Sequence, residues 1–166
     1  LMQAEAGYLH LSGEPGSPPA RMGLSIVDYM TGITTAVAIL SSLFGVLKGG
    51  RGHDIDVSLF DVALHQLTYP GAWYLNSGYR TERLPRSAHP STVPVQLQRT
   101  SDGWIFIMCM TQKFWVELVR TLERPDLLTH ADYATVEARR ANRDALTAVL
   151  DDVFSPAAPL PTLFWG

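Results

Sequence analysis

The sequence predicts a protein of mixed helices and strands, in which a polar segment separates two folded parts. Residues 25–48 form a long apolar run without proline, which is typical of a helix. Two strand-like runs flank a Ser-Asp-Gly turn at residues 101–103, as in a β-hairpin. Residues 76–94 are polar and contain three prolines and three arginines, a composition typical of a linker.

The N-terminal part is expected to contain a loop, two helices and a short strand. Residues 12–23 hold three prolines and three glycines and predict a loop. The helix of residues 25–48 is expected to be buried on most faces and to end at Gly49-Gly50. Residues 53–57 alternate like a strand, and residues 58–75 predict a helix that ends or kinks near Pro70.

The C-terminal part is expected to follow its hairpin with amphipathic helices. Residues 112–128 predict a helix that Pro125 ends or restarts, with apolar residues at helical spacing at Phe114, Leu118 and Leu122. Residues 134–155 predict one helix with an apolar face formed by Leu146, Val149, Leu150 and Phe154. The tail, residues 156–166, has three prolines and breaks this pattern, so it is either a docking segment or sequence foreign to the fold.

Composition excludes several classes of protein. The chain is 46% hydrophobic and 17% charged, which suits a globular core. A net charge of −3 with scattered arginines argues against a nucleic-acid partner. The apolar stretch of residues 32–47 is shorter than the roughly 20 residues that span a bilayer, so no membrane partner is expected. The single cysteine, Cys109, lies in an apolar run and predicts a buried, inert thiol in a cytoplasmic protein.

The stretch of residues 47–64 suggests two kinds of site, and we reject both. A phosphate loop follows a strand and opens a helix, whereas Gly49, Gly50 and Gly52 follow a helix. We therefore predict a helix C-cap and turn. Asp54 and Asp56 share one face of the predicted strand opposite His53, and His65 is the nearest further ligand. We predict a solvated strand face and no metal site.

Asp28 and His89 are the more interesting ionisable residues. Asp28 lies near the start of the long helix, and two interpretations stay open. It is either a helix-start carboxylate that the dipole stabilises, or a cleft carboxylate with a shifted pKa. His89 precedes Pro90 and is expected in an extended loop, with a cleft position as the alternative. His10, His65 and His130 have no partner pattern, and no Ser/His/Asp or Cys/His motif is apparent.

Taken together, four stretches resemble CoA-transferase family III, the group of formyl-CoA transferase, carnitine CoA-transferase and α-methylacyl-CoA racemase. They are residues 3–32, 38–64, 88–107 and 124–146. The resemblance implies an α/β fold, with a fragment of a Rossmann-like CoA-binding domain followed by part of a small α+β domain. Residues 1–72 would be the C-terminal piece of the large domain's N-terminal portion, residues 73–94 the linker, and residues 95–155 part of the small domain. Family subunits interlock, so a homodimer or larger homo-oligomer is expected.

The resemblance also implies a covalent reaction between an acyl-CoA and a small carboxylic acid. The CoA thioester is the substrate, and no cofactor is permanently bound. A family aspartate attacks the thioester to give a mixed anhydride, and the CoA thiolate returns to form an aspartyl-CoA thioester. The acceptor acid then collects CoA through a second anhydride. By alignment this aspartate precedes Leu1 by two positions, so we expect the 166 residues alone to be inactive.

Within the chain, the resemblance makes Asp28 a candidate catalytic residue and Met30 a candidate coenzyme-A contact. In the racemase branch the aspartate matching Asp28 moves the substrate's α-proton. In the transferase branch this region lines the active-site cleft, and residues 3–7, Gln-Ala-Glu-Ala-Gly, resemble that branch more. A different alternative is an inactive remnant whose open apolar faces drive self-association, visible by light scattering as a non-monomeric species.

Overall fold

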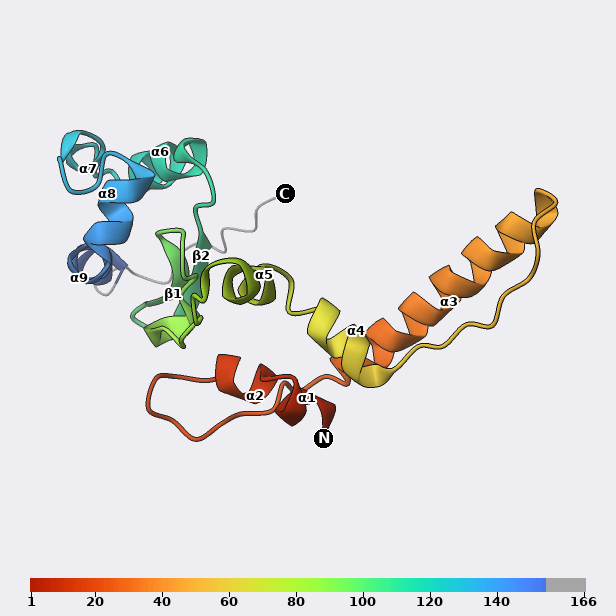
Figure 1. Ribbon diagram of the computed structural model, residues 1–166. Helices are drawn as coiled ribbons and strands as arrows, with labels where there is room; N and C mark the ends of the chain where they lie inside the picture. Colours follow the sequence, from red (N-terminus) through yellow and green to blue (C-terminus); the bar gives the residue numbers. More distant parts are fainter. Residues whose placement is uncertain (155–166) are drawn as a thin grey trace. The chain divides into compact units, whose positions relative to one another are not determined.

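The computed structural model describes residues 1–154, which form two compact units that divide between Arg83 and Leu84 (Figure 1). The first unit is built from helices and loops, and the second holds a hairpin and several helices. The division lies within the polar segment predicted as a linker. The predictions for residues 156–166 fall outside the described residues.

The first unit has a small core where its first four helices approach one another. Its elements are α1 (Met2–Glu5), α2 (Tyr8–Leu11), α3 (Ile26–Leu47), α4 (Leu59–His65) and α5 (Thr68–Ser77). Ala6, Val27 and Ala63 are buried together, with Met2, Tyr8 and Ile26 packed against them. The small alanine side chains let the segment after α1 pack directly against α3 and α4.

The end of α3 confirms the predicted glycine cap. Gly49 has a φ of 86°, a left-handed conformation that glycine adopts without strain. Its N–H donates to the Val46 carbonyl at 2.9 Å, and the Gly50 N–H donates to the Gly45 carbonyl at 3.0 Å. This pair of bonds is a Schellman motif, which satisfies carbonyls at the helix end. The amides therefore face the negative end of the helix dipole, which is unsuited to phosphate.

The expectation that α3 is buried on most faces is wrong. Of its residues only Val27 is buried, and the exposed apolar side chains include Ile33, Val37, Leu40, Phe44 and Leu47. Among residues 1–154, only the start of α3 packs into the small core of its unit. At 22 residues, α3 is long and apolar enough to cross a membrane by length and composition alone, a test that core helices of soluble proteins also pass. The absence of a membrane partner stays a prediction.

The predicted strand at residues 53–57 is also wrong. Residues 50–57 are neither helix nor strand. A strand requires a neighbour that accepts and donates its main-chain hydrogen bonds. The alternating pattern of residues 53–57 is typical of a strand, but no strand within residues 1–154 pairs with this segment.

Residues 58–77 form two helices, as the proline predicted. Ser58 caps α4 by accepting the Asp61 N–H at 3.0 Å. α4 ends at His65 and α5 begins at Thr68, so Pro70 lies in the first turn of α5. A proline there loses no helical hydrogen bond, because first-turn N–H groups have no intrahelical acceptor.

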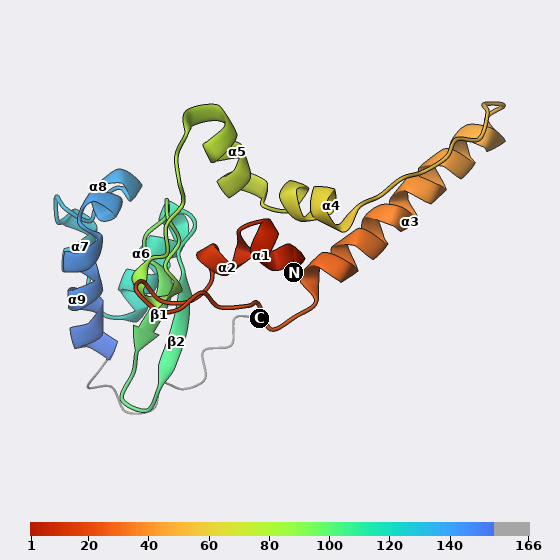
Figure 2. The same ribbon diagram turned by 60° about the horizontal axis from the view of Figure 1, so that its bottom comes forward.

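The predicted hairpin is confirmed in the second unit. β1 (Val95–Arg99) and β2 (Trp104–Met108) pair antiparallel, with Val95 opposite Met108 and Arg99 opposite Trp104. The Thr100 N–H closes the turn onto the Gly103 carbonyl at 3.0 Å. A short 3-10 turn, η1 (Pro85–Ser87), precedes the hairpin, and α9 (Arg143–Phe154) lies against β1 (Figure 2).

Helices α6 (Gln112–Thr121), α7 (Asp126–Thr129), α8 (Val136–Ala141) and α9 (Arg143–Phe154) complete the second unit. The predicted burial of Leu146, Leu150 and Phe154 is confirmed, and Val149 is partly buried. The α6 face is shifted by one residue: Trp115 and Val119 are fully buried, whereas Phe114 is 44% exposed.

The single helix predicted over residues 134–155 is wrong, because α8 and α9 separate at Asn142. The Asn142 side-chain amide donates to the Ala138 carbonyl at 3.0 Å. Local bonds of this kind compete with the helical ladder, which is why asparagine favours helix ends.

A buried guanidinium connects the loops of the second unit. Arg139 is fully buried and donates to the Val93 carbonyl at 2.9 Å, the Tyr133 carbonyl at 2.8 Å and Gln112 Oε1 at 3.0 Å. It also stacks over the Trp115 ring at 4.8 Å from the centroid. Burial lowers the pKa of Arg139, which is the electrostatic cost of holding a cation in this core.

Substituting apolar residues of the second unit by alanine should cost more stability at buried positions than at exposed ones. Leu146→Ala is expected to lower the free energy of unfolding by about 2–5 kcal/mol, because it leaves a cavity in a fully buried site. Urea unfolding followed by circular dichroism measures the loss. Phe114→Ala serves as the control and should change stability by only about 0.5 kcal/mol. An equal loss for both variants would contradict the described core.

Candidate functional site

The predicted site residues Asp28 and Met30 lie in the first two turns of α3. Asp28 is the third residue of the helix and is exposed, and Met30 is half-buried. Within residues 1–154 the Asp28 carboxylate makes no hydrogen bond or ion pair. Its position matches the helix-start interpretation, where the dipole favours a negative charge. A place for Asp28 in a cleft stays a prediction.

Gln3 fixes the segment that leads into α3. Its Nε2 donates to the Leu24 carbonyl at 3.1 Å, and its Oε1 accepts the Met22 N–H at 3.0 Å. The side-chain amide of Gln3 therefore acts as both donor and acceptor toward the main chain of residues 22–24, as the backbone of a neighbouring strand does. Sequence reasoning did not single out Gln3, because its partners lie about twenty residues away with no local signal.

Tyr8 joins α2 to α4 beside this segment. Its hydroxyl donates to the Ala63 carbonyl at 2.9 Å, and burial raises the pKa of Tyr8. Gly7, with a φ of 83°, makes the corner between α1 and α2. These contacts place the first two helices and the start of α3 in one small cluster.

Arg83 holds the proline-rich loop of residues 12–23. Its Nε donates to the His10 carbonyl at 2.7 Å, and its Nη1 donates to the Ser17 carbonyl at 2.8 Å and the Glu14 carbonyl at 3.2 Å. Gly13 has a φ of 97°, and a Cβ there would lie 3.0 Å from Ser17 Oγ. The loop therefore has a defined conformation. The sequence did not show which of the three arginines in residues 76–94 would hold it.

The acidic pair after α3 is not part of a metal site in the described residues. His53, Asp54 and Asp56 are exposed on the unpaired segment, and His65 is exposed at the end of α4. No group of three or more His, Cys, Asp or Glu side chains within residues 1–154 is placed to hold a metal ion.

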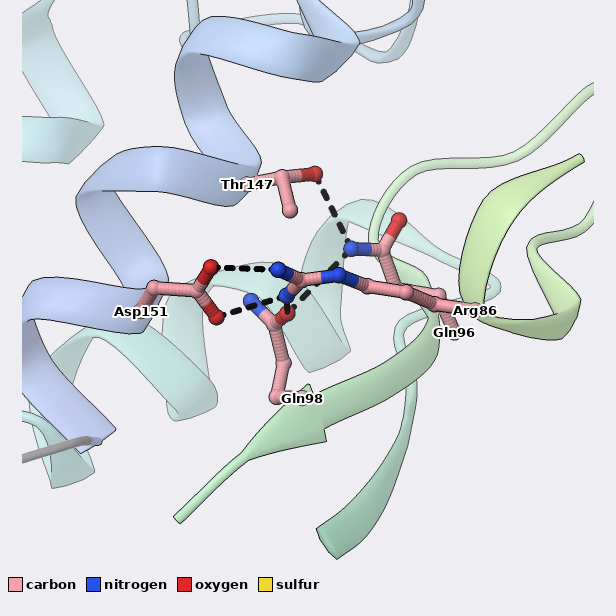
Figure 3. Close-up of polar contacts among 5 residues, drawn as sticks. All are labelled: Arg86, Gln96, Gln98, Thr147 and Asp151. Atoms are coloured by element: carbon pink, nitrogen blue, oxygen red, sulfur yellow. Dashed lines mark hydrogen bonds and ion pairs between the residues drawn. The ribbon is translucent and has the colours of Figure 1, made fainter. Parts of the chain in front are cut away.

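In the second unit, Arg86 lies at the centre of a polar network that the sequence did not predict (Figure 3). Its two terminal nitrogens donate to the two Asp151 carboxylate oxygens, each at 2.6 Å, and Nη1 also donates to Gln98 Oε1 at 3.0 Å. Gln96 Nε2 donates to Thr147 Oγ1 at 2.9 Å and to the same Gln98 oxygen at 3.3 Å. The bidentate Arg86–Asp151 pair connects η1 to α9, and the bond to Gln98 connects η1 to β1.

The network is an anchor and not a reactive centre. Gln98 is fully buried, and its Nε2 has no hydrogen-bond partner among the described residues. The Arg86 and Asp151 charges neutralise each other at hydrogen-bond distance, and the other groups are two amides and a hydroxyl. No strong nucleophile or free base stands in this arrangement.

His89 lies in the predicted loop ahead of β1. Its N–H donates to the Val95 carbonyl at 2.8 Å, and its ring Nδ1 accepts the Ser91 N–H at 3.2 Å. Its carbonyl accepts Arg143 Nη2 at 2.7 Å. Burial, and then the positive charge of Arg143, lower the pKa of His89. The uncharged ring is therefore the form that the fold favours.

Cys109 is buried at the end of the hairpin, which confirms its predicted burial. Burial raises its pKa to about 11, although the nearby positive charge of Arg139 acts in the opposite direction. Because the thiolate is the reactive species, Cys109 is unsuited to nucleophilic catalysis in the folded protein.

Comparison with known proteins places these features in a family context. The model of the family described as CoA-transferase family III matches residues 1–158. An "Acyl-CoA transferase" from Fusarium pseudograminearum is 35% identical over 155 residues, which is 93% of this chain and 34% of that protein. The human "Succinyl-CoA:glutarate CoA-transferase" is 30% identical over 154 residues, covering 93% of this chain and 35% of that protein.

The fold also matches solved structures. A CAIB/BAIF family protein from Brucella suis superposes with a TM-score of 0.71 at 34% identity, over 95% of this chain and 41% of that one. The α/β character of the chain agrees with this match. The chain spans about a third of the length of the curated relatives described above.

The shifted pKa of His89 predicts a pH-dependent stability. The unfolded chain binds a proton on His89 near the ordinary pKa of 6.5, whereas the folded chain binds it at a lower pH. The free energy of unfolding should therefore fall as pH drops below 6.5, and this loss should level off below the folded pKa. Urea titrations across this range measure it. The dependence should be weaker in His89→Gln, and identical curves for both proteins would refute the assignment.

Proposed function

Because the chain belongs to CoA-transferase family III, we propose that it forms part of an enzyme that moves coenzyme A from an acyl-CoA to a small carboxylic acid. The family match over residues 1–158 carries this proposal. The human relative's name specifies a CoA donor, succinyl-CoA, and a dicarboxylic acceptor, glutarate. Small carboxylic acids are therefore the acceptor class to test first.

The proposed reaction is covalent and uses an aspartate that precedes Leu1. Its carboxylate attacks the thioester carbonyl, a C–O bond forms, and the C–S bond breaks to release CoA thiolate. The thiolate then attacks the aspartyl carbonyl of the anhydride and displaces the acyl donor as a free carboxylate. The acceptor acid repeats these steps in reverse order. Splitting one exchange into acyl transfers lowers each barrier, and no permanently bound cofactor is required.

Within the described residues, the first turns of α3 are the proposed contribution to the cleft. Gln3 ties α1 to the segment before α3, and the buried Val27 packs with Ala6. Asp28 and Met30 follow directly on this fixed segment. We propose Asp28 as a polar cleft residue and Met30 as a contact to coenzyme A.

We also propose a cytoplasmic homo-oligomer. The exposed apolar side chains along α3, such as Val37, Leu40 and Phe44, support association with further protein surface. An inactive, self-associating form of the 166 residues would use the same surface.

CoA transfer tests the proposed function in the whole protein that contains this chain. With succinyl-CoA and a panel of small carboxylic acids, we expect a new acyl-CoA and free succinate in equal amounts. Liquid chromatography with mass detection measures both. Hydrolysis of succinyl-CoA without a new thioester, for every acid in the panel, would contradict the proposal.

The racemase alternative predicts a different isotope result. A proton-transfer enzyme using Asp28 would incorporate deuterium from heavy water at the α-carbon of a 2-methylacyl-CoA, and Asp28→Asn would abolish this incorporation. We expect no incorporation with the unsubstituted protein. The names of both curated relatives described above specify CoA transfer, which favours this outcome.

The 166 residues alone should not bind coenzyme A with useful affinity. The chain spans about a third of its curated relatives, so most contacts to the nucleotide would come from elsewhere. Isothermal titration calorimetry with CoA should show no saturable heat at micromolar concentrations. Saturable micromolar binding would show that residues 1–154 already hold the main CoA site.

A further inference from the structure

Two arginines three residues apart anchor the chain in different units. Every Arg83 acceptor described above lies in residues 9–18 of the first unit. Every Arg86 acceptor described above lies on β1 or α9 of the second unit. The boundary between the compact units falls between these two side chains.

The Arg86 anchor holds the backbone in a conformation that it would not adopt freely. Arg86 has φ 61° and ψ 31°, and Ser87 has φ 53°. Non-glycine residues rarely take left-handed conformations, and two in succession require support from surrounding contacts. The two-point bond from Arg86 to Asp151 supplies that support, and Arg143 holds the next stretch through the His89 carbonyl.

The anchor in the first unit, Arg83, lies directly at the boundary between the two units. Arg83 donates to the His10 carbonyl in α2 and the Ser17 carbonyl in the loop after it, and Glu82 pairs with His10 at 3.3 Å on the surface of the first unit. Only Leu84 and Pro85 remain between the anchors. Leu84 is extended, with φ −113° and ψ 148°, and the proline ring restricts the φ of Pro85.

We propose that Leu84–Pro85 is the pivot about which the two units change their relative orientation. Hinges are typically a few loop residues that absorb the backbone rotation while the flanking segments move as rigid bodies. Here the rigid segments begin at the two arginines, so the rotation is confined mainly to Leu84. The inference rests on the two anchors and is independent of the proposed CoA chemistry.

Pulsed electron paramagnetic resonance on the 166-residue chain tests the pivot. Spin labels at Ser41→Cys on α3 and Asp144→Cys on α9 report one distance across the boundary, and both positions are exposed. Buried Cys109 stays in place, and dilution with unlabelled protein removes distances between molecules. Leu84→Gly/Pro85→Gly should broaden the distance distribution, because glycine frees the backbone at the pivot.

A second double glycine variant, at residues 87–88, tests whether the broadening is specific to the pivot or follows from added backbone flexibility anywhere in this segment. Ser87→Gly/Ala88→Gly lies between the Arg86 and Arg143 anchors and should leave the distribution unchanged. Arg86→Lys keeps the charge but loses the two-point fork, so it should broaden the distribution by releasing residues 86–88. Equal broadening by both glycine pairs, or no broadening at residues 84–85 with both units folded by circular dichroism, would overturn the proposal.

Discussion

The buried guanidinium of Arg139 is the constraint on which the second unit depends. Within residues 1–154 it bonds two main-chain carbonyls and one side-chain amide oxygen, with no carboxylate among these acceptors. The acceptors come from the segment before β1, from the loop after α7 and from α6. A buried cation is tolerated only where such groups replace its water shell. The same bonds fix the loops that would otherwise leave carbonyls unpaired.

Arginine plays a related role in both units because their loops are rich in proline. Residues 12–23 and 85–94 each contain three prolines, which have no N–H to donate. These loops therefore have more carbonyl acceptors than main-chain donors. Arg83 supplies donors to the first loop, and Arg139 and Arg143 supply them to the second. Side chains that looked like scattered surface charges in the sequence complete the hydrogen bonding of these segments.

The predictions succeeded where the determining contacts are local. The glycine cap of α3, the break before Pro70 and the hairpin turn each depend on residues within a few positions of one another. They failed where a distant partner decides. Residues 53–57 have a strand pattern but no partner strand among the described residues, and α3 is apolar but uncovered there. The contacts around the candidate site could not be predicted either, since Gln3 and Arg83 form hydrogen bonds with segments 19 to 73 residues away.

The sequence by itself determined the family, because four motifs in one order and spacing cover nearly the whole chain, and the family model matches residues 1–158. It also determined the positions of most turns and helix ends, which follow from backbone chemistry. Only the tertiary structure decided which face of α6 is buried, where α8 ends, and which arginine bonds which loop. Those outcomes depend on contacts between side chains far apart in the chain. Local sequence patterns do not determine which of these contacts form.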